Sequence, residues 1–143
     1  MKLLTITVPC FNSENYLRRC LDSLVTGGDD VEIIVVDDGS VDGTGDIAED
    51  YAGCFPEIVK VVHKENGGHG SGINTGLRLA SGKYFKVVDS DDWLEEKAYR
   101  ELLKQMKVWS NLENSYPSPD LVICNYTYNH LDEGMEKIGT QKK

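Results

Sequence analysis

Two short acidic runs follow two of the most apolar stretches of this 143-residue chain. Asp37 and Asp38 come directly after the apolar run 31–36, and the run Asp89-Ser90-Asp91-Asp92 follows the apolar stretch 84–88. Several carboxylates at one place repel one another and resist ionising together, whereas a divalent cation relieves that repulsion. Carboxylate oxygens are ligands that Mg²⁺ or Mn²⁺ accepts, with substrate phosphates completing the coordination shell. The acidic runs therefore point to a cation that bridges to a diphosphate.

Other residues have the chemistry to hold the rest of a nucleotide. The glycine-rich segment 65–72 would let the backbone approach a ligand closely. Phe11 could stack on a base, because every base has a π face, and Asp38 could accept a hydrogen bond from a ring N–H. Each feature also has a plainer interpretation: the acidic run 37–42 can be a polar turn with a helix cap, and Phe11 can be a core residue. Together they favour a nucleotide diphosphate site bridged by a metal.

Short apolar runs alternate along the chain with segments whose apolar residues recur at three-and-four spacing. The runs are typical of strands buried on both faces, and the spacing predicts amphipathic helices between them. This order predicts an α/β fold: a mostly parallel twisted sheet with helices on both faces. The five predicted strands span residues 3–8, 31–36, 58–62, 84–88 and 121–128. Ligands of such sheets bind beyond the carboxyl ends of the strands, so both acidic runs and residues 9–12 should share one edge.

Charge and composition exclude several classes of protein. Lys and Arg total 15 against 24 Asp and Glu, for a net charge of −9, which argues against nucleic acid as a partner because phosphate backbones need clustered cations. No stretch reaches the roughly 18–20 apolar residues of a membrane span. The four cysteines, Cys10, Cys20, Cys54 and Cys124, fit neither a zinc site nor a disulfide framework. We therefore expect a cytoplasmic chain, with peripheral attachment at the inner face of the membrane as an open alternative.

Two other α/β families share part of this pattern. Phosphoreceiver signalling domains also carry paired acids after a strand, but after the first strand, and they have a lysine after the last strand where this chain has Asn129-His130. Sugar-phosphate nucleotidyltransferases usually have a glycine-rich first loop with a basic residue, where this chain has Pro9-Cys10-Phe11-Asn12. Both stay as alternatives. The turn after the first predicted strand lacks the dinucleotide-binding fingerprint G-x-G-x-x-G, and the sequence has no P-loop fingerprint.

Five motifs in order resemble glycosyltransferase family 2, whose members have the GT-A (nucleotide-diphospho-sugar transferase) fold. The resemblance extends from about residue 3 to residue 128. The motifs are Thr7-Val8-Pro9-Cys10-Phe11-Asn12 with Glu14, Ile34-Val35-Val36-Asp37-Asp38-Gly39-Ser40 with Asp42, Glu65-Asn66-Gly67-Gly68, Asn74-Thr75-Gly76, and Val88-Asp89-Ser90-Asp91-Asp92. Each motif alone is weak, but their common order is specific.

The resemblance implies a hexosyltransferase type of enzyme that binds a UDP-sugar with Mn²⁺ or Mg²⁺ and transfers the sugar with inversion. The nucleotide-sugar site would comprise Pro9, Phe11, Asn12, Glu14, Asp38, Asn66, Gly67, Asp89 and Ser90. Within it, Pro9 and Phe11 would border the base, Asp38 would read the uracil ring, and Asp89 would lie near the ribose or sugar. Asp91 would bind the metal. The acceptor would be a glycan or a lipid-linked molecule, as in the biosynthesis of cell-wall or capsule polysaccharides.

The chain departs from the family pattern in two places. Ile73 stands before Asn74, where family members often have an arginine. The family's general-base carboxylate belongs to a later segment, and the acidic pair Asp132-Glu133 comes too soon after the last predicted strand to match it. We therefore expect a donor-binding domain over residues 1–128 and a polar tail over 129–143 that begins an acceptor-binding segment. This chain should bind the nucleotide-sugar but transfer the sugar poorly.

Overall fold

A computed structural model describes residues 2–112, 119–130 and 135–139 of the chain. The chain divides into two compact units, Met1–Asn111 and Leu112–Lys143. Each unit is described here by itself. No helix in the described part of the chain is both long and apolar enough to cross a membrane.

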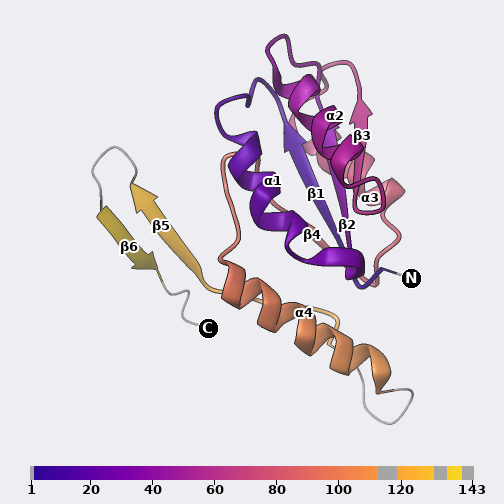
Figure 1. The fold of residues 1–143 in the computed structure, drawn as a ribbon, viewed down its shortest axis with the longest axis vertical. Coiled ribbons are helices and arrows are strands. Elements are labelled where there is room, and N and C mark those ends of the chain that lie inside the picture. Colours follow the sequence, from indigo (N-terminus) through magenta and orange to yellow (C-terminus); the bar gives the residue numbers. More distant parts are fainter. Residues whose placement is uncertain (1, 113–118, 131–134, 140–143) are drawn as a thin grey trace. The chain divides into compact units, whose positions relative to one another are not determined.

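The first unit is built on a four-stranded parallel sheet with the strand order β3-β2-β1-β4. Its strands are β1 (Leu4–Cys10), β2 (Val31–Asp37), β3 (Val59–His63) and β4 (Tyr84–Val87). Cys10 of β1 is paired with Asp37 of β2, and Asp37 is paired in turn with His63 of β3. These strands therefore end level with one another, at one edge of the sheet (Figure 1). The prediction of a parallel α/β sheet is confirmed.

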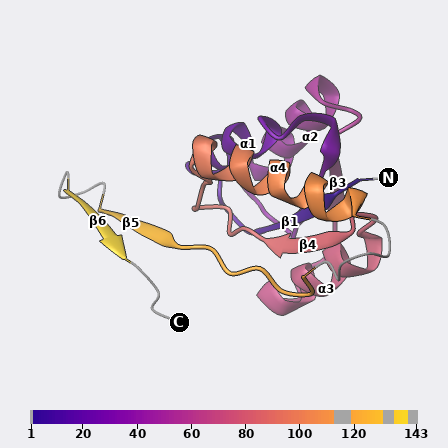
Figure 2. The same ribbon diagram turned by 90° about the horizontal axis from the view of Figure 1, so that it is seen from below.

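Helices cover both faces of this sheet, as predicted. The helices are α1 (Leu17–Val25), α2 (Thr44–Cys54), α3 (His69–Leu79) and α4 (Glu96–Asn111), with a short 3-10 helix at Gly28–Asp30. Figure 2 shows α1, α2 and α4 on one face and α3 alone on the other. Helix α3 packs closely on β1: a Cβ atom added at Gly76 would overlap the side chain of Thr7. In the first turn of α3, a Cβ atom added at Gly72 would lie 3.1 Å from the Cβ atom of Pro9, so this turn lies against the carboxyl end of β1.

The core lies between the sheet and these helices. Every residue of β1 and β2 is buried, which agrees with strands covered on both faces. Helix α1 buries the apolar stripe that its spacing predicted, formed by Leu17, Cys20, Leu21 and Leu24. From α4, Tyr99 adds its ring to the core and donates a hydrogen bond from its hydroxyl to the carbonyl of Leu24 at 2.9 Å.

Glu32, near the start of β2, is a buried carboxylate that hydrogen-bonds to four donor groups. It accepts hydrogen bonds from the hydroxyl of Thr5, the ammonium of Lys60, and the N–H and hydroxyl of Ser81, all at 2.7–3.0 Å. Burial alone would raise the pKa of Glu32, but these hydrogen bonds outweigh it and lower the pKa to about 2. Glu32 therefore ties β1, β2, β3 and the loop before β4 together.

The second unit corrects the prediction of a fifth strand over residues 121–128. Strand β5 (Tyr126–His130) begins later and pairs in antiparallel fashion with β6 (Met135–Gly139), in a separate two-stranded sheet. Leu121 and Ile123, which precede β5, are exposed. A short apolar run does not by itself determine whether it forms a strand, or with which strand it pairs. The pair Asp132-Glu133 lies outside the described residues, and the donor-binding role of residues 1–128 stays a prediction.

Candidate functional site

A pocket of about 500 Å³ lies at the carboxyl edge of the first unit's sheet. Four segments contribute to its walls: the loops after β1, β2 and β4, and the loop that leads into α3. The lining residues are Pro9, Cys10, Phe11, Asn12, Ser13, Tyr16, Asp38, Asn66, Gly68, His69, Asp89, Ser90 and Asp91. Segments about 80 residues apart in the sequence therefore meet around one cavity, as parallel strands predict.

The loop after β1 carries a tight turn at Asn12, whose φ of 49° lies in the left-handed region. Asparagine tolerates this conformation better than most residues. Asn12 donates its N–H to the hydroxyl oxygen of Ser40 and accepts the N–H of Val41 on its amide oxygen, both at 3.0 Å. Phe11, next to the turn, remains 50% exposed and lines the pocket. Its ring is thus available to a ligand and is not part of the core.

At the end of β2, Asp38 is a buried carboxylate that organises the glycine loop. It accepts hydrogen bonds from the Lys64 ammonium at 2.7 Å and from the N–H groups of Gly67 and Gly68 at 2.8 and 2.9 Å. Burial alone would raise the pKa of Asp38, but these donors outweigh it and hold the pKa below its usual value. Asp38 is therefore ionised at neutral pH and fixes the entry to α3.

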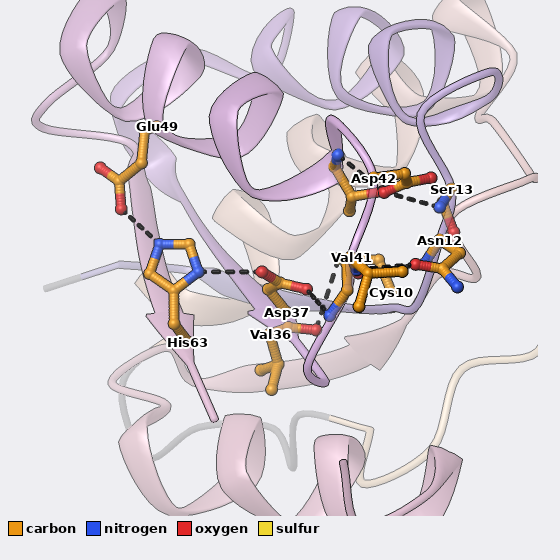
Figure 3. A network of polar contacts seen from close by, with 11 residues as sticks. Cys10, Asn12, Ser13, Val36, Asp37, Val41, Asp42, Glu49 and His63 are labelled. Atoms are coloured by element: carbon orange, nitrogen blue, oxygen red, sulfur yellow. Dashed lines mark hydrogen bonds and ion pairs between the residues drawn. The ribbon is translucent and has the colours of Figure 1, made fainter. Parts of the chain in front are cut away.

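Its neighbour Asp37 belongs to a different network, on the side of β2 that faces α2. Figure 3 shows the His63 ring between the carboxylates of Asp37 and Glu49, at 2.9 and 2.7 Å. Hydrogen bonds to these two acids raise the pKa of His63. Asp37 also accepts the N–H of Ser40 at 3.0 Å, so this network supports the loop that holds Asn12.

At the end of β4, Asp89, Asp91 and Asp92 are exposed, and each places a carboxylate oxygen within 4.8 Å of the others. Burial, together with the charges of Asp91 and Asp89, raises the pKa of Asp92. His69 lies opposite, with its Nε2 atom 3.4 Å from Asp89. Three hard oxygen donors that repel one another fit a divalent cation of the Mg²⁺ or Mn²⁺ type.

Most of the predicted site residues line the pocket. Those that do are Pro9, Phe11, Asn12, Asp38, Asn66, Asp89, Ser90 and Asp91. Glu14 and Gly67 do not: Glu14 accepts the N–H of Gly43 at 2.8 Å, beside the start of α2, and Gly67 donates its N–H to Asp38. Their predicted contact with the nucleotide stays a prediction, and in this structure both residues support neighbouring loops.

Five lining residues were not among the predicted site residues: Cys10, Ser13, Tyr16, Gly68 and His69. Ser13 has the pattern of a helix cap, but α1 begins only at Leu17, and the Ser13 carbonyl accepts the N–H groups of Tyr16 and Leu17. Gly68 and His69 lie in the glycine-rich segment 65–72, which the sequence indicates as a whole without distinguishing these two positions.

Cys10, the cysteine that lines the pocket, is held as a thiol. Cys10 is buried and donates its thiol to the carbonyl of Val36. Burial raises the pKa of its thiol to about 12, so it remains a thiol at neutral pH. Cys20 is buried as well, whereas Cys54 and Cys124 are exposed, and all four are free thiols.

The chain is similar to known proteins in sequence and in fold. GlyA, a glycosyltransferase of Streptococcus pneumoniae, is 38% identical over 133 residues, which cover 92% of this chain and 18% of GlyA. S. aureus TarS in complex with UDP-GlcNAc has a TM-score of 0.65 and 30% identity, covering 84% of this chain and 37% of that one. The mannosyltransferase PcManGT from Pyrobaculum calidifontis, in complex with GDP-Man and Mn²⁺, has a TM-score of 0.62 and 27% identity, covering 70% and 31% of the two chains.

This chain thus spans less than two fifths of the length of each of these three proteins. The sequence model of glycosyl transferase family 2 matches residues 5–125, which include all the residues that line the pocket. The alternation of strands and helices agrees with that match, as does the pocket at the carboxyl edge of the sheet. The chain belongs to glycosyltransferase family 2, and it has the α/β GT-A fold of that family.

Proposed function

We propose that this chain forms the donor site of a metal-dependent, inverting glycosyltransferase of the hexosyltransferase type, and that the donor is a UDP-sugar. The observation that carries the proposal is one pocket that joins an exposed aromatic ring, an ionised buried carboxylate, and Asp89 and Asp91 from the exposed cluster of three aspartates. TarS, a structural neighbour at 30% identity, has been crystallised with UDP-GlcNAc and with UDP. This likeness supports uracil over other bases.

The base would lie between the loops after β1 and β2. Phe11 offers an exposed face for stacking, with Pro9 beside it. Asp38 already accepts three hydrogen bonds, and a carboxylate has about four lone-pair sites. The remaining site can accept the ring N–H of uracil. Because Lys64 and the glycine loop keep Asp38 ionised, that acceptor is present at neutral pH.

The diphosphate would lie toward the loop after β4. Asp91, with Asp89 and Asp92 beside it, would hold Mn²⁺ or Mg²⁺ through carboxylate oxygens. When bound, the cation would act as a Lewis acid on the departing diphosphate. An acceptor hydroxyl, on a glycan or a lipid-linked molecule, would attack the anomeric carbon from the side opposite the diphosphate, as the bond from that carbon to the diphosphate breaks. Its proton would pass to the general-base carboxylate that the family has in a later segment. PcManGT, crystallised with a nucleotide-sugar and Mn²⁺, supports this use of the aspartates.

The proposal is tested by thermal unfolding with UDP in the presence and absence of Mn²⁺. At about 100 times the dissociation constant, ligand should raise the melting temperature by about 5–10 °C. Asp91→Ala should remove the Mn²⁺-dependent part of this shift. Asp50→Ala is the matched control, since Asp50 is an exposed aspartate on α2 that pairs only weakly with Arg18 at 3.7 Å.

The outcomes separate the competing functions. An unchanged melting temperature with UDP and Mn²⁺ together would contradict the donor site. A shift with beryllofluoride and Mg²⁺, but none with UDP, would favour a phosphoreceiver domain. A preference for UTP with a sugar phosphate over a UDP-sugar would favour a nucleotidyltransferase, and a larger shift with GDP than with UDP would reassign the base.

A further inference from the structure

Two buried hydroxyl groups join the two sides of the pocket. The Oγ atoms of Ser13 and Ser90 lie 2.7 Å apart, and the two residues are 7% and 9% exposed. Ser13 belongs to the loop after β1, which carries Phe11, whereas Ser90 lies between Asp89 and Asp91 in the loop after β4. This contact therefore spans 77 positions of the sequence and connects the base side of the pocket with the metal side.

The other loops of the pocket are tied mainly to one another. The loop after β1 is tied to the loop after β2 through Asn12, and the loop after β2 holds the glycine loop through Asp38. The loop after β4 is anchored at its two ends, where Val88 donates its N–H to the Thr7 carbonyl at 3.0 Å and Leu94 donates its N–H to the Ser23 hydroxyl oxygen at 3.1 Å. Between these anchors, Asp89 has two weaker contacts: His69 at 3.4 Å, and the Cys20 thiol 3.6 Å from the Asp89 carbonyl. Thiols are weak donors.

The connection continues from Ser13 to the backbone. The Ser13 hydroxyl lies 3.3 Å from the carbonyl of Phe11, to which it can donate. A hydroxyl has one proton to donate and two lone pairs to accept with, so either serine can be the donor in the 2.7 Å contact between them. A chain of hydrogen bonds thus runs from Ser90, between the two aspartates, to the backbone of the exposed aromatic residue.

We propose that Ser13 is a positioning residue that holds the Asp89–Asp91 turn at a fixed place relative to the base-binding loop. This inference rests on the proposed function. The contact strengthens the coupling between metal binding and nucleotide binding, because a diphosphate that reaches both sides benefits from a fixed spacing between them. Coupling of this kind is symmetrical: Mn²⁺ strengthens UDP binding by the same factor as UDP strengthens Mn²⁺ binding.

The test measures how much Mn²⁺ strengthens UDP binding, as the ratio of the UDP dissociation constants without and with Mn²⁺ in calorimetric titrations. Ser13→Ala should reduce this ratio roughly tenfold, the effect of one lost buried hydrogen bond. Binding of uridine, which lacks phosphates, should stay within about twofold of wild type. Ser90→Ala should have the same effect, and Ser13→Ala should add nothing further in the Ser90→Ala background.

Ser40→Ala is the matched control. It removes a hydrogen bond from the same loop, the one that accepts the N–H of Asn12, but it does not touch the loop after β4. It should weaken uridine and UDP alike and leave the ratio unchanged. If Ser13→Ala fails to fold, the Ser90→Ala variant carries the test alone.

An unchanged ratio in Ser90→Ala and in folded Ser13→Ala would overturn the proposal, as would an equal fall in uridine affinity. These results differ from a failure of the proposed function. In that case the wild-type protein itself would show no Mn²⁺-dependent binding of UDP, and the positioning role would fall with it.

Discussion

The ends of β2 and β4 both present aspartates to the same edge of the sheet, but in opposite states. Asp37 and Asp38 are each 5% exposed, and each is held by a cationic or protonatable partner. Asp89, Asp91 and Asp92 are exposed and face one another. Correspondingly, the pKa of Asp38 is lowered, whereas the pKa of Asp92 is raised.

The difference shows which acids the fold itself needs. A buried carboxylate must be paired and hydrogen-bonded. His63 therefore contacts Asp37, whereas Lys64 and the glycine loop donate hydrogen bonds to Asp38. Exposed carboxylates can repel one another at modest cost in water, and their remaining need is a counter-ion. We infer that Asp37 and Asp38 stabilise the loops that form the pocket. We infer further that Asp89, Asp91 and Asp92 instead bind the cation of the ligand.

The largest expected effect is on stability, from removing the carboxylate at the end of β2. Asp38→Ala leaves the Lys64 ammonium and two loop N–H groups without their acceptor, so the free energy of unfolding should fall by about 3 kcal/mol. Asp91→Ala should change it by less than about 0.5 kcal/mol. Urea unfolding measures the free energy of unfolding of both variants. Equal losses would contradict the claim that the fold needs the acid at the end of β2 but not the acid after β4.

The next effect concerns UDP binding and separates the base side from the metal side. Phe11→Ala removes a stacking surface worth about 1–3 kcal/mol, so UDP affinity should fall roughly 5–150-fold. The fall should be the same with and without Mn²⁺, unlike that in Asp91→Ala. Titration of both variants with UDP, with and without Mn²⁺, measures these losses of affinity. A loss in Phe11→Ala that appears only with Mn²⁺ would contradict the assignment of Phe11 to the base side of the pocket.

A smaller effect should appear in the pH dependence of stability. The pKa of His63 is raised in the folded state by Asp37 and Glu49, so its contribution is fully present below about pH 6.5, the unfolded value. The contribution disappears as pH rises through the folded pKa. The stability difference between wild type and His63→Gln should thus shrink from pH 5.5 to pH 8. It should stay below about 1 kcal/mol, because the side chain is 49% exposed. A difference that grows with pH would contradict this account.

The smallest effect should come from relieving repulsion at the end of β4. Burial and the charges of Asp91 and Asp89 raise the pKa of Asp92, so without metal Asp92→Asn should raise the free energy of unfolding by roughly 0.3 kcal/mol. The gain should disappear in 1 M salt, where the Debye length is about 3 Å. Chemical unfolding at low and high salt provides the measurement. A loss of stability at low salt would mean that the Asp92 carboxylate stabilises the fold rather than being repelled.

The sequence predicted the parts of the site that depend on strand order. Apolar runs located the four parallel strands, and the acids after β2 and β4 then had to meet at one edge. It could not predict that Asp38 lines the pocket whereas Asp37 supports a neighbouring loop. That difference depends on contacts with Lys64 and His63, which lie at the end of β3. Nor could it reveal the Ser13–Ser90 contact, since a serine before a helix has the pattern of a cap.

The second unit shows a different limit. Residues 121–128 have the apolar composition of a strand, yet β5 begins at Tyr126 and pairs with β6 rather than with the parallel sheet. Strand pairing is a long-range choice, and the local composition of one segment does not specify its partner.

The most direct test of the account is the position of the metal in crystals grown with UDP and Mn²⁺. Anomalous diffraction at the manganese edge should give a peak within coordination distance of the Asp91 carboxylate and of both UDP phosphates, with Asp38 outside the metal's shell. A manganese peak at Asp37 or Asp38, or a UDP diphosphate bound in the pocket without manganese, would contradict the assignment of these two strand ends.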